Sequence, residues 1–312
     1  TGVSGSGKSS LVSQALPALV RTALGHVHEP DPEEEGEAQS AMKGRVTGIE
    51  GLRRLVAVDQ KPIGRTPRSN LATYTGLFDA VRKLFAASPS ARRKGFGADR
   101  FSFNLPPGRC PNCEGEGSVM VELLFLPSVY TPCPACRGAR YNPETLAVKL
   151  RGHNIAQVLA FTVDEALAFF RNDAPVCRSL ETLAEVGLGY LRLGQSATEL
   201  SGGEAQRIKL ATELQRVQHG NTLYVLDEPS TGLHAHDAAR LVTLLHRLVE
   251  AGNSVVVVEH DMGIVAGADW VLDMGPGAGD EGGQVVGAGV PAEVAALSGS
   301  RTAPWLAAHL QG

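Results

Sequence analysis

The chain has 312 residues, 43% of them hydrophobic, and a formal net charge of −4 at pH 7. The hydrophobic content supports a buried core and excludes wholesale disorder, and the length allows one large domain or two of ordinary size. The negative charge excludes a chain that is basic throughout, so contact with nucleic acid would have to come from a local patch. The sequence also has no run of about 18 apolar residues that would predict a membrane span.

The first ten residues match a phosphate-binding loop. Gly2 is followed after four residues by Gly7, Lys8 and Ser9. Glycines let backbone N–H groups approach phosphate oxygens, the lysine reaches the β- and γ-phosphates, and the hydroxyl binds Mg²⁺. We therefore predict an ATP and Mg²⁺ site made by Gly2, Ser4, Gly5, Ser6, Gly7, Lys8, Ser9 and Ser10. A buried strand normally precedes such a loop, so we expect this chain to be part of a longer protein.

Helices and strands alternate along the rest of the chain. Apolar spacing predicts a helix over 9–24, and the acidic segment 29–37 is most simply a solvated loop. Strands are predicted at 55–60, 223–226 and 254–258, and helices at 77–87, 155–171, 177–187, 201–214 and 235–250. The glycine-rich segment 275–289 is expected to join two short strands. This alternation indicates an α/β fold with a mostly parallel sheet.

Four of the five cysteines form two Cys-x-x-Cys pairs, Cys110 with Cys113 and Cys133 with Cys136. Their spacing is typical of a four-thiolate Zn²⁺ site, which is structural because it leaves no open coordination position. Two disulfides or free thiols are the alternative. The module covers about 104–141, and metal binding would supply its folding energy because so small a module has little core. Cys177 stands alone and is expected to be a small buried apolar residue.

Basic and aromatic residues surround the cysteine module. Such a mixture suits the backbone and bases of a nucleic acid. A solvated basic face above a few core aromatics explains the same pattern equally well. The basic residues are Arg92, Arg93, Lys94, Arg100, Arg109, Arg137 and Arg140, and the aromatic residues are Phe96, Phe101, Phe103 and Tyr141.

An acidic pair follows the predicted strand 223–226. Asp227 is placed to hold Mg²⁺ together with Ser9, and Glu228 is a candidate base that orients or activates the attacking water. A solvated Asp-Glu pair at a strand end is the alternative. The phosphate-binding loop in the same chain favours the catalytic interpretation, and with it an ATPase.

The segment from Leu200 to Arg207 is identified as the signature of the ABC ATPase superfamily. This resemblance implies that Ser201, Gly202 and Gly203 cap ATP bound on an opposing nucleotide-binding domain, so one domain alone does not complete a site. It also implies that Gln60 is the Q-loop glutamine, residues 230–233 the D-loop, and His260 the switch histidine, although a lone histidine is more often structural. The catalytic set is then Glu228, His260 and Gln60.

The expected fold is therefore α/β, an ABC-type P-loop ATPase core with an inserted helical signature domain that carries the four-cysteine zinc module. We expect residues 1–60 and 195–312 to form the core and residues 61–194 the inserted domain.

Taken together, the chain resembles the C-terminal nucleotide-binding half of the UvrA family of bacterial nucleotide excision repair. The resemblance runs along nearly the whole chain and is most specific at 59–70, the cysteine pairs, 125–130 and 186–191. It implies a large cytoplasmic protein with two ABC modules per chain that acts as a dimer, binds double-stranded DNA and prefers damaged duplex. It further implies ATP hydrolysis, no nuclease activity of its own, and loading of a UvrB-type partner.

Three departures from the family pattern keep a second hypothesis open. Lys61 stands where serine is expected, Leu71 replaces an expected proline, and the acidic 29–37 stretch is unusual. These features favour a UvrA-like paralogue of the kind associated with tolerance of DNA-binding antibiotics. A transporter ATPase subunit is a third hypothesis, and we rank it lower because transporter subunits do not carry this cysteine insertion.

Overall fold

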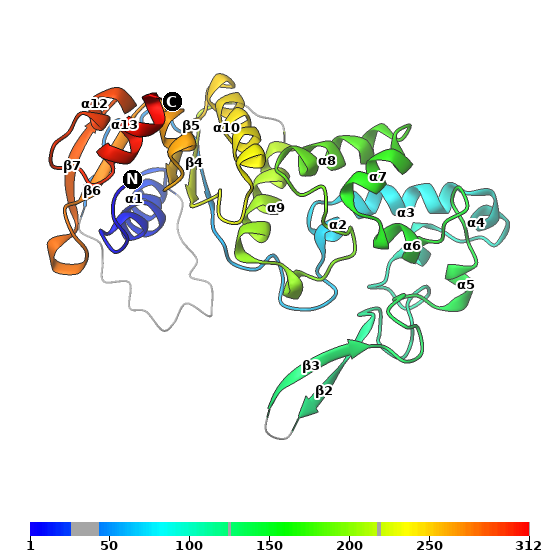
Figure 1. Ribbon diagram of the computed structural model, residues 1–312. Coiled ribbons are helices and arrows are strands. Elements are labelled where there is room, and N and C mark those ends of the chain that lie inside the picture. The colour runs from blue at the N-terminus through cyan, green and yellow to red at the C-terminus, as the bar shows by residue number, and fades with distance from the viewer. Residues whose placement is uncertain (26–43, 124–125, 217–219, 312) are drawn as a thin grey trace. The chain divides into compact units, whose positions relative to one another are not determined.

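The computed structural model describes residues 1–25, 44–123, 126–216 and 220–311 (Figure 1). The chain mixes helices and strands and divides into two compact units, 1–60 with 217–312, and 61–216. The second unit takes in residues 195–216, which the sequence-based division assigned to the core. The acidic segment 29–37 and Phe125 lie outside the described residues.

A three-stranded parallel sheet forms the centre of the first unit. Its strands β1 (Arg54–Val58), β4 (Thr222–Asp227) and β5 (Ser254–Val258) lie in the order β1-β4-β5. Val56 pairs with Tyr224, which pairs with Val255 on the far side. The parallel arrangement predicted from the apolar runs is thus confirmed for these strands, and the carboxyl ends of β4 and β5 lie side by side.

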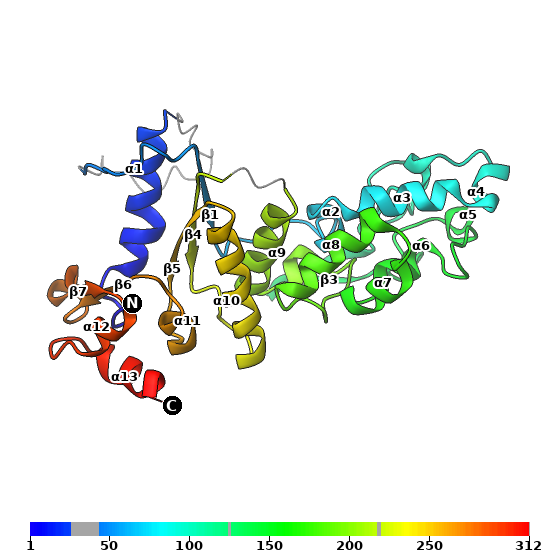
Figure 2. The same ribbon diagram turned by 90° about the horizontal axis from the view of Figure 1, so that it is seen from above.

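Helices cover the two faces of this sheet. A π-helical segment η1 (Ser10–Ala15) continues into α1 (Leu16–Ala23). Leu223 and Val225 of β4 pack with Val20 of α1, and the alternate residues of β4 face the opposite way. Figure 2 shows α1 and α10 (Ala235–Glu250) on opposite sides of the sheet. The helix predicted at 235–250 is confirmed with those bounds.

A smaller layer completes the first unit. Strands β6 (Val271–Gly275) and β7 (Gln284–Gly289) are antiparallel, so the glycine-rich segment 275–289 contains the connection between two short strands and the second strand itself. Gly2 bridges Met274 in parallel fashion, which attaches the beginning of the chain to β6. A core of Val265, Val271, Val294 and Leu306 joins these strands to α11 (Met262–Ala266), α12 (Pro291–Ala295) and α13 (Ala303–Gln311). The 3-10 turn η4 (Gly279–Glu281) lies between β6 and β7.

The second unit is mainly helical. Its helices are α2 (Leu71–Tyr74), α3 (Leu77–Ala87), α4 (Pro89–Arg93), α5 (Pro143–Leu146), α6 (Ile155–Ala160), α7 (Val163–Phe170), α8 (Ala174–Glu185) and α9 (Gly202–Leu214). The 3-10 turns η2 (Ala98–Phe101) and η3 (Ala197–Glu199) and the hairpin of β2 (Ser118–Leu123) and β3 (Leu126–Pro132) complete it. The single helix predicted at 155–171 is two helices, because Phe161 is extended and Thr162 begins a new capping box with Glu165.

Among the described residues, no helix combines the length and the apolar character that a membrane crossing requires.

Candidate active site and metal centre

The glycine-rich loop folds back on its own lysine. Gly5 and Gly7 have φ angles of 78° and 89°, in the left-handed region that glycine adopts without a steric penalty. The loop leads directly into η1. Lys8 is only 6% exposed, and its Nζ donates a hydrogen bond to the Val3 carbonyl at 2.7 Å. Burial lowers the pKa of Lys8, while the nearby carboxylates of Glu228 and other acidic residues act in the opposite direction.

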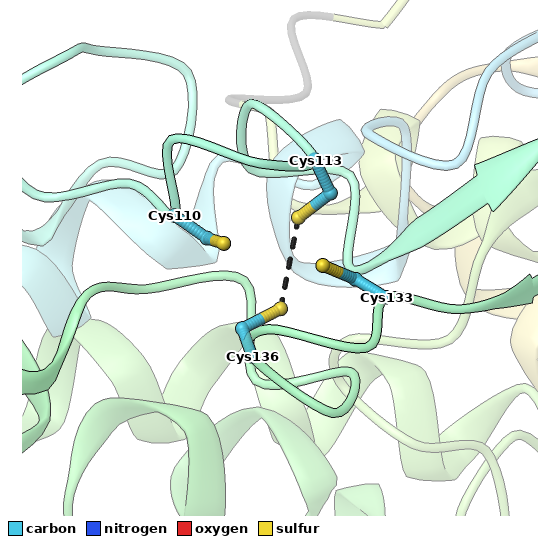
Figure 3. A group of neighbouring side chains, drawn as sticks. All are labelled: Cys110, Cys113, Cys133 and Cys136. Carbon is cyan, nitrogen blue, oxygen red and sulfur yellow. Dashed lines mark hydrogen bonds between the residues drawn. The ribbon is translucent and has the colours of Figure 1, made fainter.

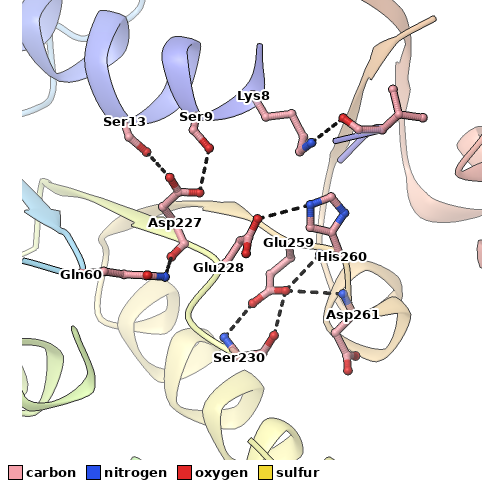
Figure 4. A network of polar contacts seen from close by, with 11 residues as sticks. Lys8, Ser9, Ser13, Gln60, Asp227, Glu228, Ser230, Glu259, His260 and Asp261 are labelled. Atoms are coloured by element: carbon pink, nitrogen blue, oxygen red, sulfur yellow. Dashed lines mark hydrogen bonds and ion pairs between the residues drawn. The ribbon is translucent and has the colours of Figure 1, made fainter. Parts of the chain in front are cut away.

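The loop and the end of β4 meet at Asp227. Ser9 donates to Asp227 Oδ1 at 3.3 Å, and Ser13, one turn further along the helix, donates to Oδ2 at 2.9 Å (Figure 4). Gln60, two residues beyond β1, donates from Nε2 to the Asp227 carbonyl at 3.3 Å. Two segments that are far apart in the sequence, 9–13 and the residues around Gln60, therefore converge on Asp227.

Glu228 and His260 extend this cluster toward solvent. His260 Nε2 lies 3.4 Å from Glu228 Oε1, and the two side chains are 47% and 43% exposed. Glu228 has a φ of 46°, which costs a residue with a Cβ about 1–2 kcal/mol. Parallel pairing of β4 with β5 places these residues at the same edge of the sheet.

The signature segment begins α9 in the second unit. The Ser201 hydroxyl accepts a hydrogen bond from the Glu204 N–H at 3.3 Å, and Glu204 Oε2 accepts from the Ser201 N–H at 2.7 Å. This capping box satisfies N–H groups at the beginning of the helix. Tyr190 donates to the other oxygen of Glu204 at 2.7 Å, so it orients the carboxylate that holds Ser201.

The four predicted ligands converge in the second unit. One ligand atom from each of Cys110, Cys113, Cys133 and Cys136 lies within 4.8 Å of every other, and Figure 3 shows the sulfurs directed at a common centre. The Cys113 and Cys136 sulfurs are 3.6 Å apart, and all four cysteines are free rather than paired in disulfides. The disulfide alternative is therefore wrong, and the cluster could hold a metal ion.

The two cysteine pairs have the same backbone turn. After the second cysteine of each pair, Glu114-Gly115 and Arg137-Gly138 both adopt positive φ angles. A Cβ at Gly115 would lie 1.8 Å from the Phe103 carbonyl oxygen, so glycine is required there. The two cysteine pairs therefore form a repeated knuckle.

Burial and hydrogen bonds to sulfur act in opposite directions on the pKa values of this cluster: burial raises the pKa of Cys113 overall, whereas hydrogen bonds lower that of Cys133. Gly117 N–H donates to Cys113 Sγ at 3.3 Å, and Asn112 Nδ2 donates to Cys133 Sγ at 3.1 Å. Burial acts to raise the pKa of Cys133, but the hydrogen bonds from the Cys136 amide and from Asn112 lower it to about 6. Burial raises the pKa of Cys136 to about 12. Such contacts are typical of the shell that orients metal ligands.

The basic and aromatic residues near the cluster divide between core and surface. Phe101, Phe103 and Tyr141 are at most 1% exposed, so they belong to the core and cannot stack on bases. Arg140 is also buried, and its guanidinium donates to the Pro67 and Gly194 carbonyls at 2.9 and 3.2 Å. Arg100 is ion-paired with Glu144, and Arg109 is ion-paired with Glu114. Of the predicted set, Arg92, Arg93, Lys94 and Arg137 are exposed.

Two known proteins with similar sequences carry the same name. The chain is 55% identical over 308 residues to UvrABC system protein A of Thermus thermophilus and 50% identical over 311 residues to that of Pasteurella multocida, which covers 98% and 100% of this chain. The chain belongs to the UvrA family. The alignments cover 31% and 32% of these UvrA proteins, so the chain spans about a third of their length. No protein-family model matches the chain.

A solved UvrA-family structure has the same fold. The crystal structure of UvrA2 from Deinococcus radiodurans superimposes with a TM-score of 0.88 at 62% sequence identity. The match covers 99% of this chain and 36% of the UvrA2 chain. The family resemblance inferred from motifs is therefore confirmed.

Motif reasoning missed several residues of these sites. Ser13 contacts Asp227 as Ser9 does, and its position four residues later on a helix is a spacing that could have indicated it. Asn112 lies inside the first cysteine pair and contacts a sulfur of the second. Glu259, next to His260, is buried and accepts hydrogen bonds from Ser230, a contact that no local pattern signals.

Proposed function

We propose that this chain forms an ATP-hydrolysing module of a UvrA-family protein that binds DNA. The observation that carries the proposal is the convergence of the glycine-rich loop, Gln60, Asp227, Glu228 and His260 in one cluster. Each of these residue types is one that an ATPase needs, and together they come from four separate segments. A chance match of the loop pattern would not gather the other three.

The residues of the loop fit a nucleotide and Mg²⁺. The Ser6 hydroxyl is fully buried and has no hydrogen-bond partner among the described residues, so it has a donor to spare for an oxygen that the chain itself does not supply. Ser9 and Asp227 offer oxygen ligands 3.3 Å apart, the hard donors that Mg²⁺ prefers. Lys8 would bind the β- and γ-phosphates, and Mg²⁺ would neutralise charge that develops on the phosphate oxygens.

The side chains at the sheet edge have separate roles in hydrolysis. Glu228 would accept a proton from, or orient, the attacking water, and its half-exposed carboxylate is accessible to that water. His260 would hold the Glu228 carboxylate through their 3.4 Å contact and approach the γ-phosphate. Gln60 connects β1 to the backbone of Asp227. A movement of Asp227 at the proposed Mg²⁺ site would therefore be transmitted through Gln60 to the segment that follows residue 60.

The signature segment supports assembly with a second nucleotide-binding module. Ser201, Gly202 and Gly203 begin α9, and N–H groups at a helix beginning attract anions. In ABC ATPases this segment faces a nucleotide on an opposing module, so we propose a dimer with sites completed between modules.

The cysteine cluster fits Zn²⁺. A tetrahedron with metal–sulfur distances of about 2.3 Å has sulfur–sulfur edges of about 3.8 Å, close to the 3.6 Å between Cys113 and Cys136. Bound Zn²⁺ would act structurally, because the four thiolates would occupy every position of that tetrahedron.

We further propose double-stranded DNA, preferentially damaged, as the ligand, with a UvrB-type partner and a cytoplasmic location. The name of the relatives, UvrABC system protein A, supports a role in excision repair. The exposed cations Arg92, Arg93 and Lys94 at the end of α4 supply charge for phosphate contacts.

A second candidate is a UvrA paralogue that does not feed excision repair. It is favoured by the 62% identity to UvrA2, compared with 55% and 50% to the two UvrA proteins named above, and by Lys61 and Leu71. Complementation separates the candidates. Rescue of ultraviolet sensitivity in a strain without the repair protein supports excision repair, whereas absence of rescue together with antibiotic tolerance supports the paralogue.

DNA binding tests the proposal directly. The full-length protein should bind duplex more weakly as salt rises from about 50 to 200 mM, and Arg92→Gln with Arg93→Gln should reduce the salt slope by about one for each phosphate interaction that is removed. Arg240→Gln, which removes an exposed arginine on α10, is the control for a change of charge elsewhere. Equal affinity for damaged and intact duplex in every nucleotide state would refute damage recognition.

A further inference from the structure

One buried carboxylate beside the proposed ATP site has no part in the chemistry described so far. Glu259 follows β5 and precedes His260, and it is only 3% exposed. A buried carboxylate is costly unless hydrogen bonds replace its water. The donors that surround Glu259 therefore indicate which parts of the chain it holds.

Those donors come from two different turns. Glu259 Oε1 accepts from the Ser230 N–H at 2.8 Å, and Oε2 accepts from the Ser230 hydroxyl at 2.9 Å. Oε2 also accepts from the His260 N–H at 3.0 Å and lies 3.4 Å from the Asp261 amide nitrogen (Figure 4). One carboxylate thus ties the turn after β4 to the turn after β5.

These two turns carry Glu228 and His260, the side chains proposed above to act in ATP hydrolysis. Glu228 lies two residues before Ser230, and its carbonyl accepts from the Thr231 N–H at 3.1 Å. Glu228 has a positive φ of 46°, a conformation that a non-glycine residue keeps only where its surroundings enforce it. Its own N–H donates to the Val258 carbonyl at 2.8 Å, so the residue is fixed on one side by β5 and on the other by the turn that Glu259 holds.

We propose that Glu259 is a positioning residue for ATP hydrolysis. It does not touch the reacting atoms. It holds the two turns together, so that the Glu228 carboxylate and the His260 ring face each other at 3.4 Å. The inference rests on the proposed ATPase function and adds a residue whose effect is transmitted through Glu228.

A double-mutant cycle in the full-length protein tests this role. The variants are Glu259→Gln, Glu228→Gln and their combination, and the readouts are kcat, the affinity for ATP and thermal unfolding. Glutamine keeps the size of the side chain but replaces one acceptor by an NH₂ group that cannot accept from an N–H or O–H donor. Glu250→Gln, at the exposed end of α10, is the matched control.

We expect Glu259→Gln to reduce kcat by at least about tenfold, because hydrogen bonds to a charged group are removed. The affinity for ATP should change by less than about threefold, because the phosphate contacts are retained. In the Glu228→Gln background the second substitution should cause almost no further loss, since residues that act as a unit are not additive. The Glu250→Gln control should match the wild type.

Unchanged kcat in Glu259→Gln, or the same fold loss in both backgrounds, would overturn the inference while leaving the proposed ATPase intact. Absence of turnover in the wild-type protein, with nucleotide and DNA present, would instead refute the proposed function. If Glu259→Gln does not fold, Ser230→Ala tests the inference instead, because it removes only the hydrogen bond from the Ser230 hydroxyl to Glu259 Oε2. A lowered kcat with an unchanged affinity for ATP supports the inference, and an unchanged kcat overturns it.

Discussion

Replacing Cys133 by serine tests the metal centre most sharply. Cys133 is fully buried, its sulfur lies within 4.8 Å of the other three, and Asn112 donates to it at 3.1 Å. A serine hydroxyl is not ionised near neutral pH and is a poor ligand for a metal that prefers thiolate and imidazole. We therefore expect the substitution to remove one ligand and to leave the backbone of the knuckle in place.

The expected loss of metal affinity can be estimated because the core of the module consists mainly of the cysteines themselves. Its buried cluster consists of Cys110, Cys113 and Cys133, with Val119 and Cys136 packed against them. Structural zinc contributes about 10–16 kcal/mol to small metal-dependent domains, so an equal share for each of four thiolates is about 2.5–4 kcal/mol. Loss of one ligand should weaken metal binding by about 10²–10³-fold.

The assay measures metal content by mass spectrometry and affinity by competition with a chromophoric chelator, together with limited proteolysis of residues 104–141. Cys177→Ser is the control, because Cys177 lies outside the cluster and its thiol donates instead to Glu181 Oε1 at 3.5 Å. Cys133→Ser should lose metal to the chelator and be cut in the module, and the control should do neither. Stoichiometric metal at wild-type affinity in Cys133→Ser would refute the four-thiolate assignment.

Two further predictions concern stability in the second unit. Gly108→Ala should lower the free energy of unfolding by about 3 kcal/mol, because the added Cβ would lie 1.7 Å from the Arg100 carbonyl oxygen. Gly97→Ala is the control: its Cβ would meet nothing within 4 Å, so the free energy of unfolding should change by less than about 0.5 kcal/mol. Equal urea midpoints for the two variants would contradict this prediction. Burial acts to raise the pKa of Glu204, but hydrogen bonds from Tyr190 and Ser201 lower it overall, so this carboxylate stabilises the fold above its unfolded pKa and loses that effect as pH falls through the lowered value. Tyr190→Phe should therefore cost about 0.5–1 kcal/mol near pH 7 and less near pH 3.5 in urea titrations, and an equal cost at both pH values would be inconsistent with this role.

Local patterns predicted the parts of this protein that depend on local physics. The apolar runs predicted β1, β4 and β5 and their parallel arrangement. Short apolar strands that alternate with helices are typical of a parallel sheet that helices cover on both faces. The spacing of Cys110, Cys113, Cys133 and Cys136 predicted their convergence, because few other arrangements use that pattern.

Contacts between distant segments could not be predicted in the same way. Glu259 is buried against Ser230, and nothing near either residue in the sequence signals the other. Arg140 was assigned to a basic surface because charge is normally solvated, yet three-dimensional packing buries it against backbone carbonyls. The break at Phe161 was missed because both flanking segments have helical periodicity and the capping residue Thr162 is a weak signal when read alone.

We propose that ATP hydrolysis at the cluster around Asp227 and Glu228 controls DNA binding by the full-length protein. The most direct measurement follows ATP turnover and DNA affinity together in the full-length wild-type protein and in Glu228→Gln. We predict that Glu228→Gln binds ATP, hydrolyses it about 10²–10³-fold more slowly, and in the presence of ATP has a different affinity for damaged duplex from the wild type. Unchanged turnover, or identical DNA affinities in the two proteins with ATP present, would contradict the claim.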